Sequence, residues 1–278
     1  MKYEINSSPN EFLNYKQIHP GIDQYNLDIN VLYPNQKEKN IFLERLKQFI
    51  SSDEANSSIM ELHENIFSYK SESIIPTKVD NRPPLLLVFG NPAPHSIKAG
   101  MFFSHEGEGR EHRVWRVLRE IGLLDFDINT NIDINTFRKA SLFDLHYSSP
   151  FRIGLISYFS LPTSSSVTPW AGVAGIEKLF GKDGFKKVII EERKRLDKVI
   201  QGFMPLGGNI IVFQKDSYNG LKDENAKGYS RDDLNEGRLV SLYNSNKDII
   251  ITAVPPTRLL HSQRSKDALR GIIKDYSF

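Results

Sequence analysis

The residues best suited to chemistry follow the apolar run Leu85–Phe89, where the chain continues as Gly90-Asn91-Pro92. A strand buried on both faces that ends in such a turn presents a carboxamide at its carboxyl end. The Asn91 amide can orient a water molecule through hydrogen bonds, although it cannot serve as a full general base. The alternative is that Asn91 only caps the turn, as an isolated Asn-Pro pair often does.

The composition restricts the chemistry to oxygen and nitrogen groups. None of the 278 residues is cysteine, which excludes disulfides, zinc–thiolate sites, Cys-ligated iron–sulfur clusters and a cysteine nucleophile. The chain also lacks a Gly-x-Ser-x-Gly elbow, a Walker-type phosphate loop, a Gly-x-Gly-x-x-Gly turn and a His-Glu-x-x-His motif. We therefore expect no metal and no cofactor.

Short apolar strands that alternate with amphipathic helices must position this loop. Besides Leu85–Phe89, strands are expected within 151–161, 209–213 and 249–254, and helices at 110–121, 186–203 and 265–276, with Ser265 as the N-cap of the last. This alternation predicts an α/β fold in which a short, mainly parallel sheet forms the middle of three α/β/α layers. Ligands of such sheets bind at the carboxyl ends of the strands.

Four segments occur in an order typical of one superfamily. They are the loop with Asn91-Pro92, Ser96, Gly100 and Phe103, then His112-Arg113-Val114-Trp115, then GLISYFSLPTSS at 154–165, and FQKDSY at 213–218. This series resembles the uracil-DNA glycosylase superfamily, in particular its mismatch-specific and single-strand-selective branches. The corresponding motifs there are Gly-x-Asn-Pro-Gly, Asn-Arg-Phe-Trp, a segment ending in Arg-Pro-Thr, and a Leu-Gly-Lys-x-x-Tyr strand end.

The resemblance implies a monofunctional DNA glycosylase of base excision repair that hydrolyses the N-glycosidic bond of a damaged or deaminated, uracil-type base. By this resemblance Asn91 positions the attacking water and Phe103 stacks on the extruded base, although Phe103 has the alternative of a core aromatic. The base-reading Asn of several branches has no clear equivalent, so the base remains open. The implied substrate-binding residues are Gly90, Pro92, Ser96, Gly100, Phe103, Ser157 and Tyr158.

The chain departs from the family after its last strand, where the family carries His-Pro-Ser or Asn-Pro-Ser. Pro255 stands at the His or Asn position and offers neither a side-chain donor nor a backbone N–H. Either His261 reaches back as a catalytic group, or leaving-group stabilisation is weaker or comes from backbone amides; otherwise His261 is solvated or caps a helix. The candidate DNA wedge and phosphate contacts are Pro256, Thr257, Arg258 and Leu259, with a core position as the alternative for Leu259.

Charge is nearly balanced, with 36 basic and 34 acidic residues, so positive charge for a DNA partner must be gathered locally. Residues 98–119 carry five basic side chains against three acidic ones, and residues 258–275 carry five against two. Both flank the loops that would meet single- or double-stranded DNA with a lesion, although a solvated helix face explains them equally well. The basic residues within 182–198 are expected on a solvated face, and His95 and His105 are expected to be solvated too.

Two functions besides the glycosylase remain open. One is a catalytically inactive nucleic-acid-binding member of the same fold, and the other is a small-molecule hydrolase on an α/β frame. Residues 1–80 are expected to form a mostly helical extension, with helices at 41–50 and 58–69, and residues 81–278 to form the glycosylase-like domain. Neither a membrane-length apolar run nor a signal-type h-region occurs, so we expect a protein of the cytoplasm of a prokaryotic cell, without a membrane partner. The sequence does not determine the oligomeric state, and a monomer is the default expectation.

Overall fold

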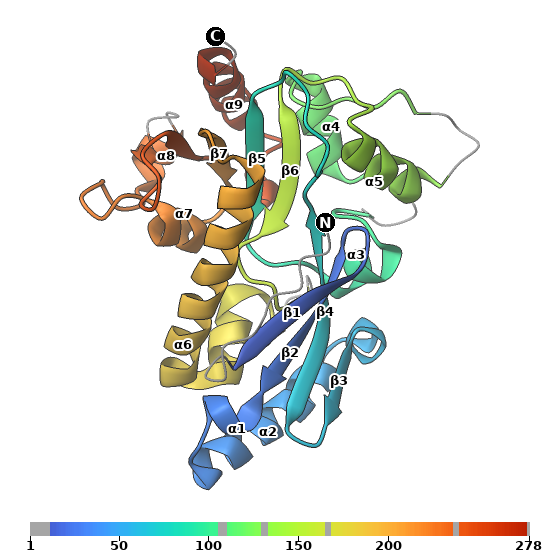
Figure 1. Cartoon of the computed structure of the whole chain (residues 1–278), viewed down its shortest axis with the longest axis vertical. Coiled ribbons are helices and arrows are strands. Elements are labelled where there is room, and N and C mark those ends of the chain that lie inside the picture. The colour runs from blue at the N-terminus through green and yellow to red at the C-terminus, as the bar shows by residue number, and fades with distance from the viewer. Residues whose placement is uncertain (1–11, 105–109, 129–132, 165–167, 236–238, 277–278) are drawn as a thin grey trace. The chain divides into compact units, whose positions relative to one another are not determined.

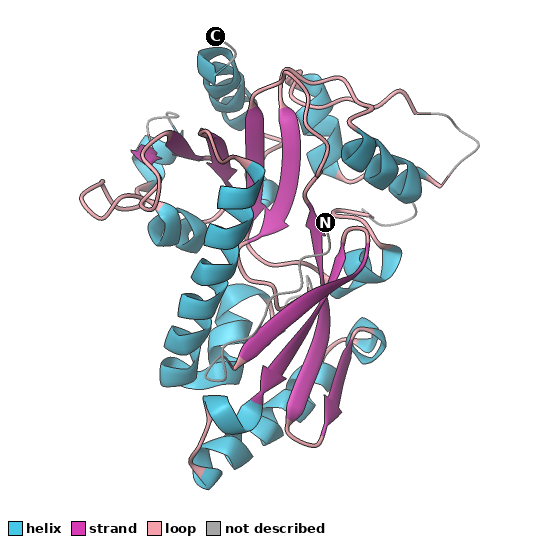
Figure 2. Ribbon diagram, viewed as in Figure 1, coloured by secondary structure: helices cyan, strands magenta, loops and turns pink. Residues whose placement is uncertain are grey.

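The structure, a computed structural model, describes residues 12–104, 110–128, 133–164, 168–235 and 239–276. His105 lies outside these residues. The fold is mixed α/β, as predicted (Figure 2). The chain divides into two compact units, each assembled from separate stretches. Unit 1 comprises Met1–Ser73, Asn91–Phe102 and Phe159–Lys194, and unit 2 comprises Ile74–Gly90, Phe103–Tyr158 and Arg195–Phe278.

Unit 1 contains an antiparallel sheet in the order β1-β2-β4-β3 (Figure 1). Its strands are β1 (Leu13–His19), β2 (Ile22–Asp28), β3 (Met60–His63) and β4 (Ile66–Ile74). Tyr15, Tyr25 and Tyr69 occupy one register position across β1, β2 and β4. Their rings stack with centroids 5.2 and 5.1 Å apart. Such cross-strand aromatic pairs stabilise a sheet and fix its register.

These strands correct the expectation that residues 1–80 are mostly helical. The helix at 41–50 is confirmed within α2 (Gln36–Ser51), but the helix at 58–69 is wrong, because this segment forms β3, a turn and the start of β4. The turn contains Glu64 at φ 53°, a left-handed conformation that the sequence does not signal with a glycine. The sequence therefore gives no signal for the hairpin turn, because glutamate usually favours helices.

The remaining elements of unit 1 pack around aromatic side chains. The Phe42 ring of α2 lies 5.1 Å from that of Tyr33 and 5.5 Å from that of Phe180, and the Tyr33 hydroxyl donates to the Phe180 carbonyl at 2.5 Å. Phe180 belongs to α6 (Gly172–Phe203), whose helical path is interrupted at Gly181, at φ 67°. The shorter helices are α1 (Ile29–Leu32), η1 (Glu54–Ser58) and α3 (Pro94–Ala99).

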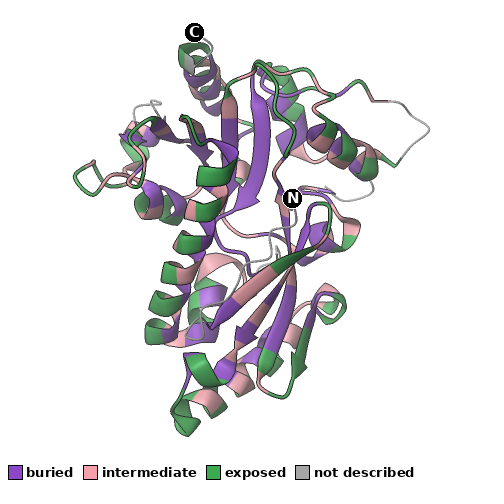
Figure 3. Ribbon diagram, viewed as in Figure 1, coloured by how far each residue is buried: buried purple, intermediate pink, exposed green. Residues whose placement is uncertain are grey.

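Unit 2 contains a sheet in the order β6-β5-β7-β9-β8. Its strands are β5 (Pro84–Phe89), β6 (Arg152–Ser157), β7 (Gly208–Val212), β8 (Val240–Leu242) and β9 (Ile249–Ala253). β5 pairs in parallel with β6 and β7, and β7 with β9, whereas β8 joins β9 antiparallel. Leu85–Phe89 and all of β6 are buried (Figure 3). The apolar run of β5 predicts this burial, whereas β6 also buries Arg152 and Ser157 at its two ends.

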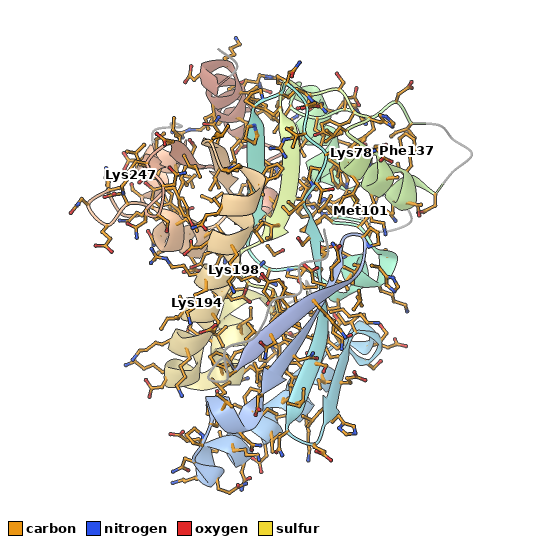
Figure 4. The ribbon with its side chains drawn as sticks, viewed as in Figure 1. Lys78, Met101, Phe137, Lys194, Lys198 and Lys247 are labelled. Atoms are coloured by element: carbon orange, nitrogen blue, oxygen red, sulfur yellow. The ribbon has the colours of Figure 1, made fainter. Side chains whose placement is uncertain are left out.

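Helices and a short connector complete unit 2. The helices are α4 (Arg113–Glu120), α5 (Ile134–Asp144), α7 (Lys215–Leu221), α8 (Arg231–Asn235), η2 (Thr257–Leu259) and α9 (Gln263–Tyr276). α9 begins before the predicted N-cap Ser265, because Ser262 Oγ accepts the Ser265 N–H at 3.2 Å. In the connector before β5, Lys78, which is labelled in Figure 4, forms an ion pair with Asp144 at the end of α5.

Glu72 of β4 provides a test of the buried part of the hairpin, since only 3% of it is exposed. Burial raises the pKa of its carboxyl well above the usual value. As pH rises above about 4.3, the unfolded chain loses this proton while the folded chain keeps it, so stability falls. We expect Glu72→Gln to raise the free energy of unfolding at pH 8 by roughly 1–3 kcal/mol, and much less at pH 4.

Urea unfolding at several pH values measures this difference. Glu61→Gln, at an exposed position of β3, is the matched control and should leave the pH profile unchanged. Parallel profiles for the wild type and Glu72→Gln would show that Glu72 is ionised in the fold.

Candidate functional site

The carboxyl ends of β6, β5 and β7 lie side by side in unit 2. The Tyr158 N–H donates to Phe89 O at 2.8 Å, and the Phe213 N–H donates to Val88 O at 3.1 Å. Along the chain, β5 is followed by β6 on one side of it and then by β7 on the other. Parallel sheets bind ligands where the strand order changes direction in this way, which here is between β5 and β7. Gly90, at the end of β5, is therefore at the expected ligand position.

Asn91 follows Gly90 directly and belongs to unit 1. Its Nδ2 donates to Thr163 Oγ1 at 2.6 Å and to Pro92 O at 3.3 Å. Thr163 is buried, and its Oγ1 also accepts the Gly172 N–H at 2.8 Å, while its own N–H donates to Pro92 O at 3.1 Å. The carboxamide is thus held by its NH₂ end, which leaves Oδ1 to accept a hydrogen bond from a water molecule.

Ser96 and Gly100, two further predicted site residues, lie on the α3 turn of unit 1. Gly100 caps α3 at φ 74°, where a side chain would be strained, and Ser96 is buried. The Ser96 carbonyl accepts the N–H groups of Gly100 and Met101. Both residues therefore shape the turn that follows Asn91 and Pro92.

Phe103, in unit 2, has a strained backbone with φ 52° and a half-buried side chain. Its ring lies edge-on to Phe89 at 4.8 Å and close to His112 at 4.9 Å. The Trp115 indole N–H donates to Phe103 O at 3.1 Å, which fixes the strained residue. Positive φ values in bulky residues persist only where the surroundings impose them, and they concentrate at functional sites. The half-buried ring packs on Phe89, His112 and Trp115, so the core alternative considered from the sequence stays open beside the base-stacking role.

Ser157 and Tyr158, at the end of β6, are almost completely buried at 1% exposure each. Their carbonyl oxygens accept from Arg195 Nη2 at 2.6 and 2.9 Å. Arg195 is itself buried, which corrects the expectation that the basic residues within 182–198 share a solvated face. The sequence could not reveal this, because its neighbours Lys194 and Lys198 are exposed on the same helix (Figure 4).

The predicted wedge forms η2 of unit 2. Leu259 is 47% exposed, which rules out its core alternative, and Arg258 is exposed beside it, while Pro256 and Thr257 are half-buried. His261 is also exposed, and its Nδ1 lies 3.1 Å from Arg258 O. This contact corresponds to the capping alternative for His261.

The two basic segments of the sequence come together in unit 2. Lys266 of α9 forms an ion pair with Glu120 of α4, and Arg270 Nη2 donates to Glu120 O at 3.4 Å. Arg113 Nη1 lies 3.5 Å from Arg258 O, so α4 also contacts η2. α4, η2 and the start of α9 therefore form one surface that carries arginines and an exposed leucine.

The predictions missed Gln214, which follows β7 in unit 2. A Cβ at Gly90 would lie 2.6 Å from Gln214 Oε1, so the Gln214 carboxamide packs against the end of β5. The segment FQKDSY was predicted to resemble the Leu-Gly-Lys-x-x-Tyr strand end, but its sequence does not indicate which side chain packs against Gly90. Thr163, by contrast, ends the Leu-Pro-Thr segment that resembles Arg-Pro-Thr, and that resemblance is the signal that could have identified it.

Comparisons with known proteins do not assign the chain to a family. Neither the protein-family models nor the curated proteins include a match to the chain. Across the described ranges, His, Asp and Glu nowhere gather in a group of three or more that could hold a metal ion. None of the described helices combines the length and the apolar composition that crossing a membrane requires.

Thr163 gives the most direct test of how Asn91 is held. Thr163→Val keeps the shape of the side chain but removes the acceptor of two hydrogen bonds, from Asn91 Nδ2 and the Gly172 N–H. We expect it to lower the free energy of unfolding by about 1–3 kcal/mol. Thr163→Ser keeps the hydroxyl and should recover most of the loss in urea unfolding. Equal destabilisation by Val and Ser would mean that the methyl group, not the hydroxyl, matters.

Proposed function

We propose that the protein is a monofunctional DNA glycosylase that hydrolyses the N-glycosidic bond of a damaged or deaminated, uracil-type base in DNA. The observation that carries the proposal is the hydrogen bond from Asn91 Nδ2 to Thr163 Oγ1, which fixes the orientation of the Asn91 amide. In this reaction the C1′–N bond breaks, the base leaves with the bonding electrons, and water adds to C1′ of an oxocarbenium-like sugar. Asn91 Oδ1 would accept a hydrogen bond from that water and orient it, without taking its proton.

A DNA glycosylase must also hold the extruded base by its face and its edge. Phe103 is suited to the face, because its strained backbone and its contacts with Phe89 and Trp115 fix the ring in advance. The carboxyl ends of β5 and β6, at Gly90, Ser157 and Tyr158, would contact the edge of the base. We also propose the three-layer architecture expected from the sequence, in which the parallel strands β6, β5, β7 and β9 form the middle of three α/β/α layers.

DNA would be bound by the surface of α4, η2 and α9. Arginine side chains neutralise phosphates, and an apolar side chain such as Leu259 can fill the space left by an extruded base. We propose a monomer that acts on lesion-containing DNA, single- or double-stranded, in the cytoplasm of a prokaryotic cell, as expected for base excision repair.

An inactive DNA-binding protein is the second candidate, and a specific observation favours it. Pro255 has no donor for the leaving base, and the exposed His261 contacts the Arg258 carbonyl. If no other group stabilises the leaving base, the protein would bind lesions in a salt-sensitive manner without releasing the base.

Asn91→Ala tests the glycosylase proposal. Removal of the water-orienting amide should lower base release from uracil-containing DNA by about 10²-fold or more, because loss of the correct position of a reacting group can cost that much. Alkali treatment of labelled oligonucleotides, followed by gel electrophoresis, measures the release. Asn81→Ala, at an exposed position of unit 2, is the control and should retain activity. Equal rates for Asn91→Ala and the wild type would remove Asn91 from the mechanism.

Leu259→Ala tests the wedge. Because Leu259 is exposed, we expect a change in stability of no more than about 0.5 kcal/mol. Affinity for lesion-containing duplex DNA should fall about tenfold in fluorescence anisotropy, as expected when an inserted apolar side chain is lost. Leu206→Ala, at a leucine that is 96% exposed in the same unit, should change neither quantity. An equal loss in both variants would argue against a specific role for η2.

A further inference from the structure

Gln214 carries a buried polar atom without a partner at the carboxyl edge of the unit 2 sheet. Its Oε1 has no hydrogen-bond donor among the residues that the structure describes, although the residue as a whole is only half-buried. Its Nε2 lies 3.4 Å from Asp216 Oδ2, so the donor end of the amide already faces a carboxylate. A buried acceptor without a donor is destabilising, and native proteins contain few of them. Gln214 Oε1 is therefore an acceptor that lacks a donor.

The backbone of Gly90 makes room for this carboxamide. A Cβ at Gly90 would lie 2.6 Å from Gln214 Oε1 and 3.0 Å from its Cδ. The pairing of Val88 with Val212, continued by two residues, brings Gly90 beside Gln214. The acceptor thus lies between β5 and β7, at the switch point where ligands of parallel sheets bind.

A cluster of aromatic rings lies in the same unit as the acceptor. Phe213, the residue before Gln214, stacks on Phe89 with ring centroids 4.8 Å apart, and Phe103 packs edge-on against Phe89. The hydroxyl of Ser217, in the first turn of α7, is a second buried polar group without a partner among the described residues. Because Phe89 and Phe213 are buried against each other, the half-buried Phe103 is the ring of this group that can offer a face to a nucleobase, and Gln214 and Ser217 supply uncharged polar groups for its edge.

We propose that Gln214 is a specificity-determining residue whose Oε1 accepts the imino N–H of a base; this inference rests on the proposed function. Uracil at N3 and hypoxanthine at N1 carry a hydrogen there, whereas cytosine N3 and adenine N1 carry a lone pair. An acceptor that faces this atom attracts the first two bases and repels the other two. Gln214 thereby distinguishes deaminated bases from their parents.

Gln214→Leu removes the acceptor while keeping a side chain of similar size. Saturation-transfer NMR on the full chain, with free uracil or free cytosine as the probe, should show that the wild type prefers uracil. The variant should lose that preference by about tenfold or more. Its urea unfolding midpoint should hardly change, since Oε1 has no partner among the described residues and Nε2 makes only a 3.4 Å contact with the exposed Asp216. Gln201→Leu, at an exposed position of α6, is the matched control and should behave as the wild type.

Gly90→Ala gives an independent second variant. The added Cβ meets the far end of a flexible side chain, so the fold can accommodate it while the Gln214 amide moves away. We expect the same loss of preference as in Gln214→Leu, and no further loss in the double variant, because both changes remove one interaction. Additive losses would show that Gly90 and Gln214 act separately and would overturn the proposal.

The outcomes for the two proposals are distinct. If the wild type releases uracil from DNA but the preference survives in Gln214→Leu, the role of Gln214 is overturned and the glycosylase proposal stands. If no base is released from DNA, yet free uracil binds in a Gln214-dependent manner, the glycosylase proposal falls and the base-reading role stands. If the wild type binds neither free base, the base-reading role is overturned.

Discussion

The position of β5 between β6 and β7 is the constraint on which the candidate site depends. β5 forms backbone hydrogen bonds along both edges, and Leu85–Phe89 are buried, so the strand cannot shift without breaking two ladders and exposing its core residues. Where β5 ends therefore determines where the backbone of Gly90 lies. Asn91 follows as the next residue, and its hydrogen bond to Thr163 then fixes the orientation of its amide.

The polar groups of the candidate site residues fall into two kinds, and each is described within its own unit. The NH₂ end of Asn91 and the Phe103 carbonyl are satisfied by Thr163 and Trp115, which hold them in place. Gln214 Oε1 and Ser157 Oγ are buried without a partner among the described residues, and Phe103 has a strained backbone. Folds optimised only for stability avoid such features, and functional sites retain them. Within unit 2, the strained Phe103 and the unsatisfied Gln214 and Ser157 are the physical basis for the base-binding role proposed above, and within unit 1 the fixed amide of Asn91 is the basis for its role.

The sequence predicted the α/β class, the strands within 85–89, 209–213 and 249–254, and a helix at 41–50, because periodicity and apolar runs record burial directly. It did not predict the β3–β4 hairpin, since Glu64 takes a left-handed turn position without the usual glycine. It also misjudged Arg195, whose buried contacts with Ser157 and Tyr158 depend on tertiary packing. Of the candidate site, the sequence predicted Asn91 and Phe103 as functional residues, and these remain predictions. It could not identify Gln214, because the absence of a hydrogen-bond partner is visible only in three dimensions.

Mass spectrometry of the products tests the central claim, hydrolysis of an N-glycosidic bond, most directly. The wild-type protein is incubated with oligonucleotides that each carry a single uracil, hypoxanthine or mismatch, and the masses of the intact strands are then measured. The account predicts that one lesion-containing strand loses its base and gains a hydroxyl group without being cut, and that the free base appears in solution. Unchanged strand masses for every lesion, under conditions where the protein binds the DNA, would contradict it.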